Sequence, residues 1–269
     1  MAPVPKRVVE RITSGIKRFQ PILAAAKTRD VNESDTVVIV TDLLQYVFGY
    51  DKYAEITSEH MIRGTFCDLA VKLEGEIAFL IEVKAIGLDL KEQWVKQAVD
   101  YAANQGIEWV ALTNGAVWRV YRVTFGQPID HELVVDFDLL TVNPRKPDHV
   151  DLVSLLAKEG WQKARLGDYH LQRQALSRFT LGALILSEPI LDALRRELRR
   201  MAPDVKIEAK QIREVLHTDV LKREVLEGEK AEAAARQVAR AAGRALRAAK
   251  VKAEASSEAA TPSVQLPTA

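Results

Sequence analysis

Residues 79–87 read FLIEVKAIG and, together with Ile77 and Ala78, form an apolar run of strand length that contains two opposite charges, Glu82 and Lys84. The two-residue period of a strand predicts one face made of Ala78, Leu80, Glu82, Lys84 and Ile86 and another made of Ile77, Phe79, Ile81 and Val83. Apolar residues on both faces indicate that the strand is covered on both sides. Burying a carboxylate and an ammonium there is costly unless they are paired, hydrogen-bonded or bound to a metal.

The preceding run, residues 65–73, is also strand-like, and Glu74-Gly75-Glu76 separates the two, which predicts a β-hairpin. A three-residue loop over 74–76 brings Asp68 directly opposite Glu82. A two-residue loop, Glu74-Gly75, sends Asp68 to the other face unless a bulge intervenes. The register of this hairpin therefore decides whether the two carboxylates can meet.

If they meet, Asp68 and Glu82 offer hard oxygen ligands of the type that Mg²⁺ uses together with waters and a substrate phosphate. Lys84 lies one pleat further along, where an ammonium is suited to orient a water or to stabilise charge at phosphorus.

The flanking sequence predicts an α/β fold. Hydrophobic periodicity favours helices over 7–27, 32–48 and 90–104 and strands over 108–113, 116–123 and 132–137. Asp89 and Glu92 have capping-box spacing at the start of the third helix, and Asn114-Gly115 is a hairpin turn signal. Residues 143–148, with two prolines, predict a domain boundary. We therefore expect a leading helix over 1–30, a site-bearing domain with a mixed sheet over 31–142, a helical region over 149–253 and a disordered tail over 254–269.

Composition limits the class of protein. The 269 residues carry a formal net charge of +1, so nucleic-acid binding would have to come from local charge. The single cysteine, Cys67, rules out an intramolecular disulfide and suits a reducing compartment. No apolar stretch is long enough for a membrane span, and the basic start, residues 1–19, is read as an ordinary helix rather than a transit peptide. We expect a cytoplasmic protein.

Asp68, then thirteen residues, then Glu82-Val83-Lys84 resembles the D…ExK signature of the PD-(D/E)XK nuclease superfamily. Three neighbouring features strengthen the resemblance. Glu33 resembles the acidic residue that many members carry on the preceding helix, and Gln97-x-x-x-Tyr101 is similar to the Q-x-x-x-Y motif in the restriction (R) subunit of type I restriction enzymes. The segment from Ala111 to Tyr121 looks like the strand pair that follows in those proteins.

The resemblance covers residues 30–125 and implies a divalent-metal-dependent DNA endonuclease with a restriction-endonuclease-like α-β-β-β-α-β core. It implies that Glu33, Asp68 and Glu82 surround Mg²⁺, or Mn²⁺ in its place, and that Lys84 acts in catalysis. Gln97 and Tyr101 would then form a wall of the site. There are departures. Cys67 stands where the motif has proline, and no G-x-x-x-x-G-K-[ST] loop is present, so we expect no ATP and no DNA motor.

Simpler interpretations stand beside these. Glu82 and Lys84 could form an ion pair on an exposed strand, Glu33 could serve the helix N-terminus, Tyr101 could be a core residue, and Gln93 could replace Gln97. The alternative function is a nuclease-derived, non-catalytic module that binds DNA or joins a complex, and action on RNA is a third. Expected partners are DNA and either a second copy of the chain or subunits of a restriction or defence complex.

Near the C-terminus, Arg236, Arg240, Arg244 and Arg247 recur at helical spacing, and no acidic residue lies between Arg236 and Lys252. This pattern is typical either of a surface that holds backbone phosphates or of the solvated face of a terminal helix. A second cluster, at residues 195–200, is interpreted as ordinary surface.

Overall fold

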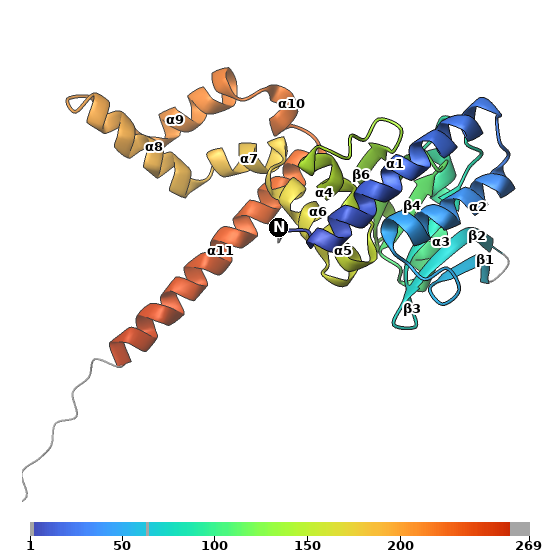
Figure 1. Cartoon of the computed structure of the whole chain (residues 1–269). Helices are drawn as coiled ribbons and strands as arrows, with labels where there is room; N and C mark the ends of the chain where they lie inside the picture. Colours follow the sequence, from blue (N-terminus) through green and yellow to red (C-terminus); the bar gives the residue numbers. More distant parts are fainter. Residues whose placement is uncertain (1–2, 63–64, 259–269) are drawn as a thin grey trace, which may run out of the picture. The chain divides into compact units, whose positions relative to one another are not determined.

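A six-stranded mixed sheet forms the centre of the first half of the chain (Figure 1). The computed structural model describes residues 3–62 and 65–258, and the chain divides into two units, Met1–His170 and Leu171–Ala269. The first unit contains α1 (Lys6–Thr28), α2 (Glu33–Leu43), the π-helical turn η1 (Leu44–Phe48), β1 (Ile56–Ile62), β2 (Thr65–Leu73), β3 (Glu76–Val83), α3 (Gln93–Gln105), β4 (Trp109–Thr113), β5 (Val117–Thr124), β6 (Asp130–Asp138), α4 (Pro147–Ser154) and α5 (Lys158–Gln162), and α6 (Arg165–Ala175) crosses the division.

The strands follow one another across the sheet in chain order, from β1 to β6. All neighbours are antiparallel except β3 and β4, which are parallel because α3 carries the chain back across one face between them. The expected α/β class with a mixed sheet is confirmed. The elements from α2 to β4 occur in the order α-β-β-β-α-β. The first of these strands, β1, has the partly polar sequence ITSEHMI and was not predicted from residue patterns.

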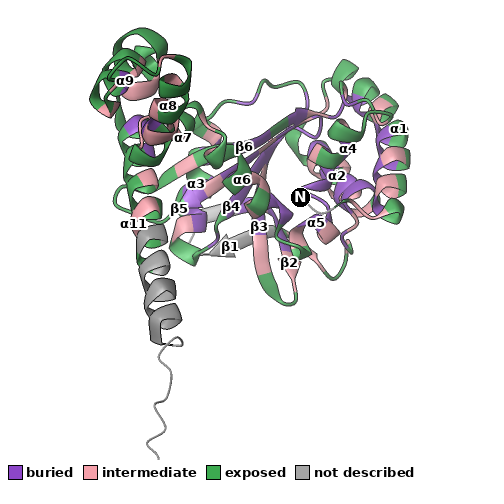
Figure 2. Cartoon of the chain, turned by 90° about the vertical axis from the view of Figure 1, so that its left-hand side faces the viewer, coloured by how far each residue is buried: buried purple, intermediate pink, exposed green. Residues whose placement is uncertain are grey.

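Both faces of the sheet are covered, as the apolar residues on both faces of β3 predict (Figure 2). Phe79, Ile81 and Val83 of β3 join the larger core cluster with α1, α2, η1 and the segment from α4 to α6. Leu80 joins a second cluster with the apolar side of α3. β3 is therefore a central strand in contact with two cores.

The leading helix forms as predicted. Val8, Ile12, Ile16 and Phe19 of α1 are all buried against the larger core. Gly15 also lies on this side, where a Cβ atom would come within 2.9 Å of Val47 in η1, so glycine permits the close approach of the two helices.

The start of α3 differs from the prediction. The helix begins at Gln93, and neither Asp89 nor Glu92 caps it with a side-chain hydrogen bond. The Glu92 carboxylate instead lies 3.4 Å from Nε2 of His131 on β6. The predicted capping box is therefore not formed. The helix ends at Gly106, whose φ of +70° is the left-handed conformation that favours glycine.

The proline-containing stretch 143–148 lies within the first unit. Val150, Val153 and Leu156, which follow it, are buried in the larger core. Trp161 of α5 packs on Phe79 of β3, with ring centroids 4.5 Å apart. The division between the units falls later, between His170 and Leu171.

Among its described residues, the second unit contains helices and the turns that connect them, and no strand. Its remaining helices are α7 (Arg178–Ile185), α8 (Glu188–Met201), α9 (Ala209–Val215), the π-helical turn η2 (Leu216–Val220), α10 (Arg223–Leu226) and α11 (Glu229–Glu258). The expected tail, 254–269, begins inside α11, and residues 259–269 lie outside the described residues. Within the described chain, no helix has the length and apolarity needed to cross a membrane.

Candidate active site on strands β2 and β3

The β2–β3 hairpin has the shorter of the two expected loops. Leu73 pairs with Glu76, which leaves Glu74-Gly75 as a two-residue turn, so the three-residue loop is wrong. Both turn residues have positive φ, +55° at Glu74 and +89° at Gly75, as a type I′ hairpin turn requires. Taken alone, this turn would place Asp68 on the wrong face.

A bulge restores the register. Lys72 pairs with Ile77 but Val71 pairs with Phe79, so Ala78 is an extra residue on β3. Beyond the bulge, Leu69 pairs with Ile81, and this register puts Asp68 opposite Glu82.

The bulge also corrects the predicted faces of β3. Ala78 packs against the larger core with Phe79, whereas Ile77 packs against the α3 cluster with Leu80. Ile86 lies past the end of the strand and joins the larger core, so it does not share the face of Leu80. Strand alternation thus holds from Phe79 to Val83 and fails on either side.

Asp68 is held at the end of the hairpin ladder. Its Oδ2 accepts a hydrogen bond from the backbone N–H of Val83 at 2.7 Å. Burial raises the pKa of this carboxyl, and the Val83 N–H and the Lys84 ammonium oppose the rise. A carboxylate in such a position is costly to keep charged without a cation.

Lys84 is the cation that the site already contains. Its backbone N–H donates to Thr113 of β4 at 2.8 Å, which fixes the residue just beyond the end of β3. Its Nζ lies 2.9 Å from Oε1 of Glu82 and 3.3 Å from Oε2 of Glu33. The Lys84 and Glu82 side chains are only 15% and 12% exposed, so this is a largely buried pair and not the exposed ion pair of the simpler interpretation.

The pKa values of this pair follow from burial and charge. Burial raises the pKa of Glu82, and the nearby Asp68 carboxylate raises it further, against the effect of Lys84. Burial lowers the pKa of Lys84, but its hydrogen bond to Glu82 and the surrounding carboxylates outweigh this, so its pKa is raised. Lys84 is therefore an ammonium at neutral pH.

Glu33 reaches the site from α2 but is not part of a buried stripe. Its side chain is 46% exposed, and Val37, one turn later, is only partly buried. Asn32 caps the helix by accepting from the Asp35 N–H at 2.9 Å, so Glu33 is not needed as the cap. Its carboxylate is free to point at Lys84.

A cleft of about 420 Å³ opens at Glu33, Glu82 and Lys84, and Asp68, opposite Glu82 on β2, is not among the residues that line it. It is lined by Glu33, Glu82, Lys84, Leu88, Gln93, Trp94 and Gln97. α3 thus forms a wall of the cleft and presents Gln97, as the resemblance implies, together with Gln93. Trp94 and Leu88 were not singled out in the sequence, because nothing in the local pattern distinguishes them from surface or core residues.

Tyr101 lies elsewhere. Its side chain is buried in the α3 cluster, and the residues that line the cleft do not include it. Burial raises its pKa, and its hydroxyl has no hydrogen-bond partner among the described residues. Its position favours the interpretation of Tyr101 as a core residue.

Cys67, which stands in the position of the motif's proline, is fully buried beside the carboxylates. Its Sγ donates to the Ile81 carbonyl at 3.2 Å. Burial first, and then the charges of Glu82 and Asp68, raise the pKa of this thiol to about 12. It is therefore a structural thiol and not a nucleophile.

The donor set fits a divalent cation held by two carboxylates. Among the described residues, no group of three or more His, Cys, Asp or Glu side chains is arranged to hold a metal ion. Mg²⁺, however, is commonly bound by one or two carboxylates and completed by waters and substrate phosphate. Asp68 and Glu82 supply such a pair. A cation would offset the burial of both carboxylates and the effect of the Asp68 charge on Glu82.

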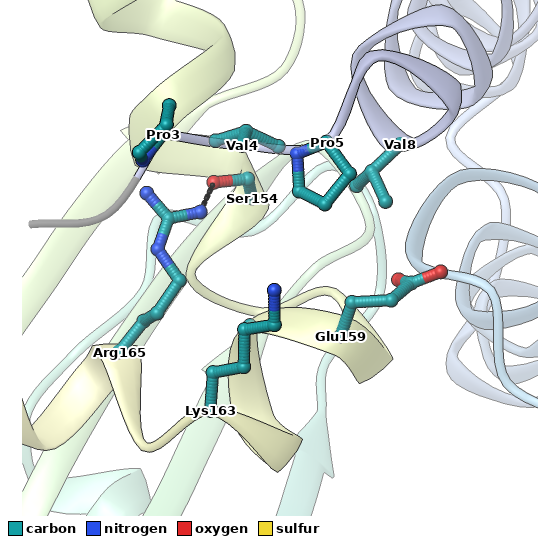
Figure 3. A pocket seen from close by; sticks show the side chains of 9 residues that line it. Pro3, Val4, Pro5, Val8, Ser154, Glu159, Lys163 and Arg165 are labelled. Carbon is teal, nitrogen blue, oxygen red and sulfur yellow. Dashed lines mark hydrogen bonds between the residues drawn. The ribbon is translucent and has the colours of Figure 1, made fainter.

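A second, much smaller cavity lies beside the N-terminal segment of the first unit (Figure 3). Its volume of about 10 Å³ is room for one water at most. The buried Arg165 guanidinium donates to Ser154 Oγ at 2.9 Å there, and Pro3 and Pro5 border the cavity on the other side. This arrangement ties α4 to α6 and offers no space for a substrate.

No family model, no curated protein and no solved structure matches this chain. Support for a function therefore comes from the geometry of the cleft and from the motif that its residues form.

Proposed function

We propose that the chain is a divalent-metal-dependent DNA endonuclease of the PD-(D/E)XK type, similar to the nuclease domain of type I restriction subunits but without their ATP-driven motor. The observation that carries this proposal is the bulge at Ala78, because it brings Asp68 opposite Glu82 despite the two-residue turn. The α-β-β-β-α-β order from α2 to β4 supports the same assignment. So does the position of Lys84 in a cleft with two carboxylates.

In this proposal Asp68 and Glu82 hold the ion, and Glu33 assists from the rim of the cleft. A bound divalent cation supplies a more acidic water and stabilises charge on the phosphate. Hydrolysis forms a bond from the water oxygen to phosphorus and breaks one phosphorus–oxygen bond of the DNA backbone.

In this proposal Lys84 acts on the same phosphate. It remains protonated because carboxylates surround it, so it can donate hydrogen bonds to the attacking water or to a phosphate oxygen. The amides of Gln93 and Gln97, on the α3 wall, are suited to hold the DNA backbone in the cleft.

The direct experiment is a Mg²⁺ titration with linear duplex, circular duplex, single-stranded DNA and RNA. It compares the wild type with Glu82→Ala and Lys84→Ala. Glu74→Ala is the matched control, because it removes an exposed carboxylate from the turn of the same hairpin. We expect Mg²⁺-dependent cleavage of DNA that falls by about 10²-fold or more in the two cleft variants and is unchanged in the control.

Three other outcomes would contradict this proposal in different ways. Unchanged cleavage in either cleft variant would refute the site assignment. Unchanged cleavage in both variants is what a contaminating nuclease would give, because neither change affects it. DNA binding without cleavage by the wild type would favour the non-catalytic module. Cleavage of RNA alone would replace the substrate.

A further inference from the structure

Helix α11 presents a row of four exposed arginines, Arg236, Arg240, Arg244 and Arg247. At about 100° per residue, their positions fall within an arc of about 80° on the helix surface, and at about 1.5 Å per residue they extend over about 16 Å. The row is therefore a narrow basic strip along one side of the helix.

The opposite side of α11 is apolar and faces the body of the second unit. Ala231 and Ala234 are buried. Val238 and Ala242 line an apolar groove of about 1020 Å³, together with Phe179 of α7. The side that holds the helix in place is thus separate from the side that carries the arginines, so the arginines are not needed for packing.

Most of the row has no acidic partner. Arg236 lies 3.5 Å from Glu232, whereas Arg240, Arg244 and Arg247 form no ion pair with any side chain that the structure describes. In contrast, Arg195 and Arg200 of α8 are each paired with an acid on their own helix. The two clusters that look alike in sequence differ in the charge that they leave available.

Formal charge is also divided unequally between the units. Leu171–Ala269 contains 18 Lys and Arg against 13 Asp and Glu, a net charge of +5, whereas Met1–His170 contains 20 against 24, a net charge of −4. The unit with the carboxylate-lined cleft therefore repels a polyanion at long range. A polyanionic substrate gains its attraction from the other unit.

We infer that the arginine row of α11 is a docking surface for the phosphate backbone of duplex DNA. The identity of this partner rests on the proposed function, and the binding itself needs neither the metal nor the cleft. The row provides affinity independent of sequence and raises the concentration of DNA near the cleft of the same chain. An anionic membrane is the less suitable partner, because the apolar side of α11 is made of small side chains and already packs within the unit.

The experiment measures binding of the full chain to a fluorescent 30-base-pair duplex by anisotropy. EDTA is present and the chain carries Glu82→Ala, so no cleavage occurs. The row variant combines Arg240→Gln, Arg244→Gln and Arg247→Gln. The matched control combines changes to Gln on exposed α8, at Arg196, Arg199 and Arg200, which remove the same charge from the same unit.

Three phosphate contacts each contribute about 0.9 to the slope of log Kd against log salt, so the row variant is expected to lower that slope by roughly 3. Its affinity at about 100 mM salt should fall at least tenfold, and that of the control less than about threefold. Circular dichroism should show equal helix content in both.

Equal losses of affinity for duplex DNA in the row variant and the control would overturn the inference, because net charge alone would then explain binding. Unchanged duplex binding by the row variant would also overturn the inference. This holds even if the row variant loses its binding to phosphatidylserine vesicles, because the partner would then be a membrane and not DNA. Row-dependent binding by a wild type that fails to cleave DNA with Mg²⁺ would support the inference while refuting the proposed nuclease.

Discussion

Replacing Asp68 with asparagine is expected to stabilise the first unit while abolishing its response to Mg²⁺. Asparagine keeps an oxygen that can accept the hydrogen bond from the Val83 N–H, and it removes one of two facing carboxylates. Residues directly opposite on antiparallel strands have Cβ atoms about 5 Å apart, and unit charges at that distance repel by about 3 kcal/mol at an effective dielectric constant of about 20. The Lys84 ammonium, 2.9 Å from Glu82, cancels part of this repulsion.

We therefore expect a net gain of about 1–2 kcal/mol without metal, or a rise in Tm of roughly 2–8 °C for a unit of this size. Calorimetry at pH 7.5 in EDTA measures it. Adding Mg²⁺ at about ten times its Kd should then stabilise the wild type by about 1.4 kcal/mol and leave Asp68→Asn unchanged.

The control is Asp100→Asn, the same chemical change on the exposed side of α3. It should shift Tm by little, since an isolated surface charge contributes within about 0.5 kcal/mol. A lower Tm for Asp68→Asn in EDTA would mean that the carboxylate stabilises the fold and is not strained. An equal Mg²⁺ response in wild type and Asp68→Asn would remove Asp68 from the metal site.

Three further changes test the frame around the site. Gly106→Ala meets no neighbouring atom but must adopt φ of +70°, so urea unfolding should show a loss of about 1 kcal/mol, and no loss would mean that α3 ends differently. Arg11 donates hydrogen bonds to Glu159 at 2.8 and 2.7 Å, and these lower the pKa of the Glu159 carboxyl. The pair therefore stabilises the fold at pH values above the ordinary pKa of a glutamate. This contribution is lost as the pH falls through the lowered pKa. Glu159→Gln should thus cost about 1–2 kcal/mol at pH 7 and less at pH 3, whereas a constant difference in unfolding free energy would contradict the pairing. Trp161→Ala removes the ring whose centroid lies 4.5 Å from that of Phe79. It should lower the unfolding free energy of the first unit by about 2–4 kcal/mol in calorimetry, and an unchanged Tm would mean that α5 does not stabilise this core.

Periodicity was enough to predict the parts of the fold that a single segment determines. The apolar residues of α1 are buried as their spacing predicts, and β3 is covered on both faces, as its apolar residues from Phe79 to Val83 predict. The limits of β4, β5 and β6 agree with the sequence to within two residues. Each of these segments can be predicted from its own sequence, because the apolar residues on its buried face or faces recur with the period of the helix or strand.

What depended on a second segment could not be predicted. Ala78 carries no mark of a bulge, since neither glycine nor proline interrupts the run, and the bulge follows from matching a two-residue turn to two cores on opposite faces of the sheet. Asp89 and Glu92 have capping-box spacing, yet α3 begins at Gln93 and the Glu92 carboxylate lies near His131 of β6. β1 alternates weakly because it is an edge strand with a single neighbour, β2.

The candidate site, too, was predicted only in part from the sequence. The residue types Asp68, Glu82 and Lys84 and their spacing were visible in the chain, and the structure brings Lys84 within 2.9 Å of Glu82. The sequence did not show that Trp94 lines the cleft or that Tyr101 is buried in the core. Both depend on how α3 is rotated against the sheet, and no local pattern sets that rotation.

The burial of Cys67 gives the protein an internal reporter. The chain has no other thiol, and this one is fully covered beside Asp68, with a pKa of about 12. A thiol-specific reagent can therefore react only in molecules in which the sheet around β2 has transiently opened, and the labelling rate measures the free energy of that opening. Without any engineered label, the breathing of the hairpin that holds the two carboxylates can be timed in the wild-type chain, with and without a divalent ion.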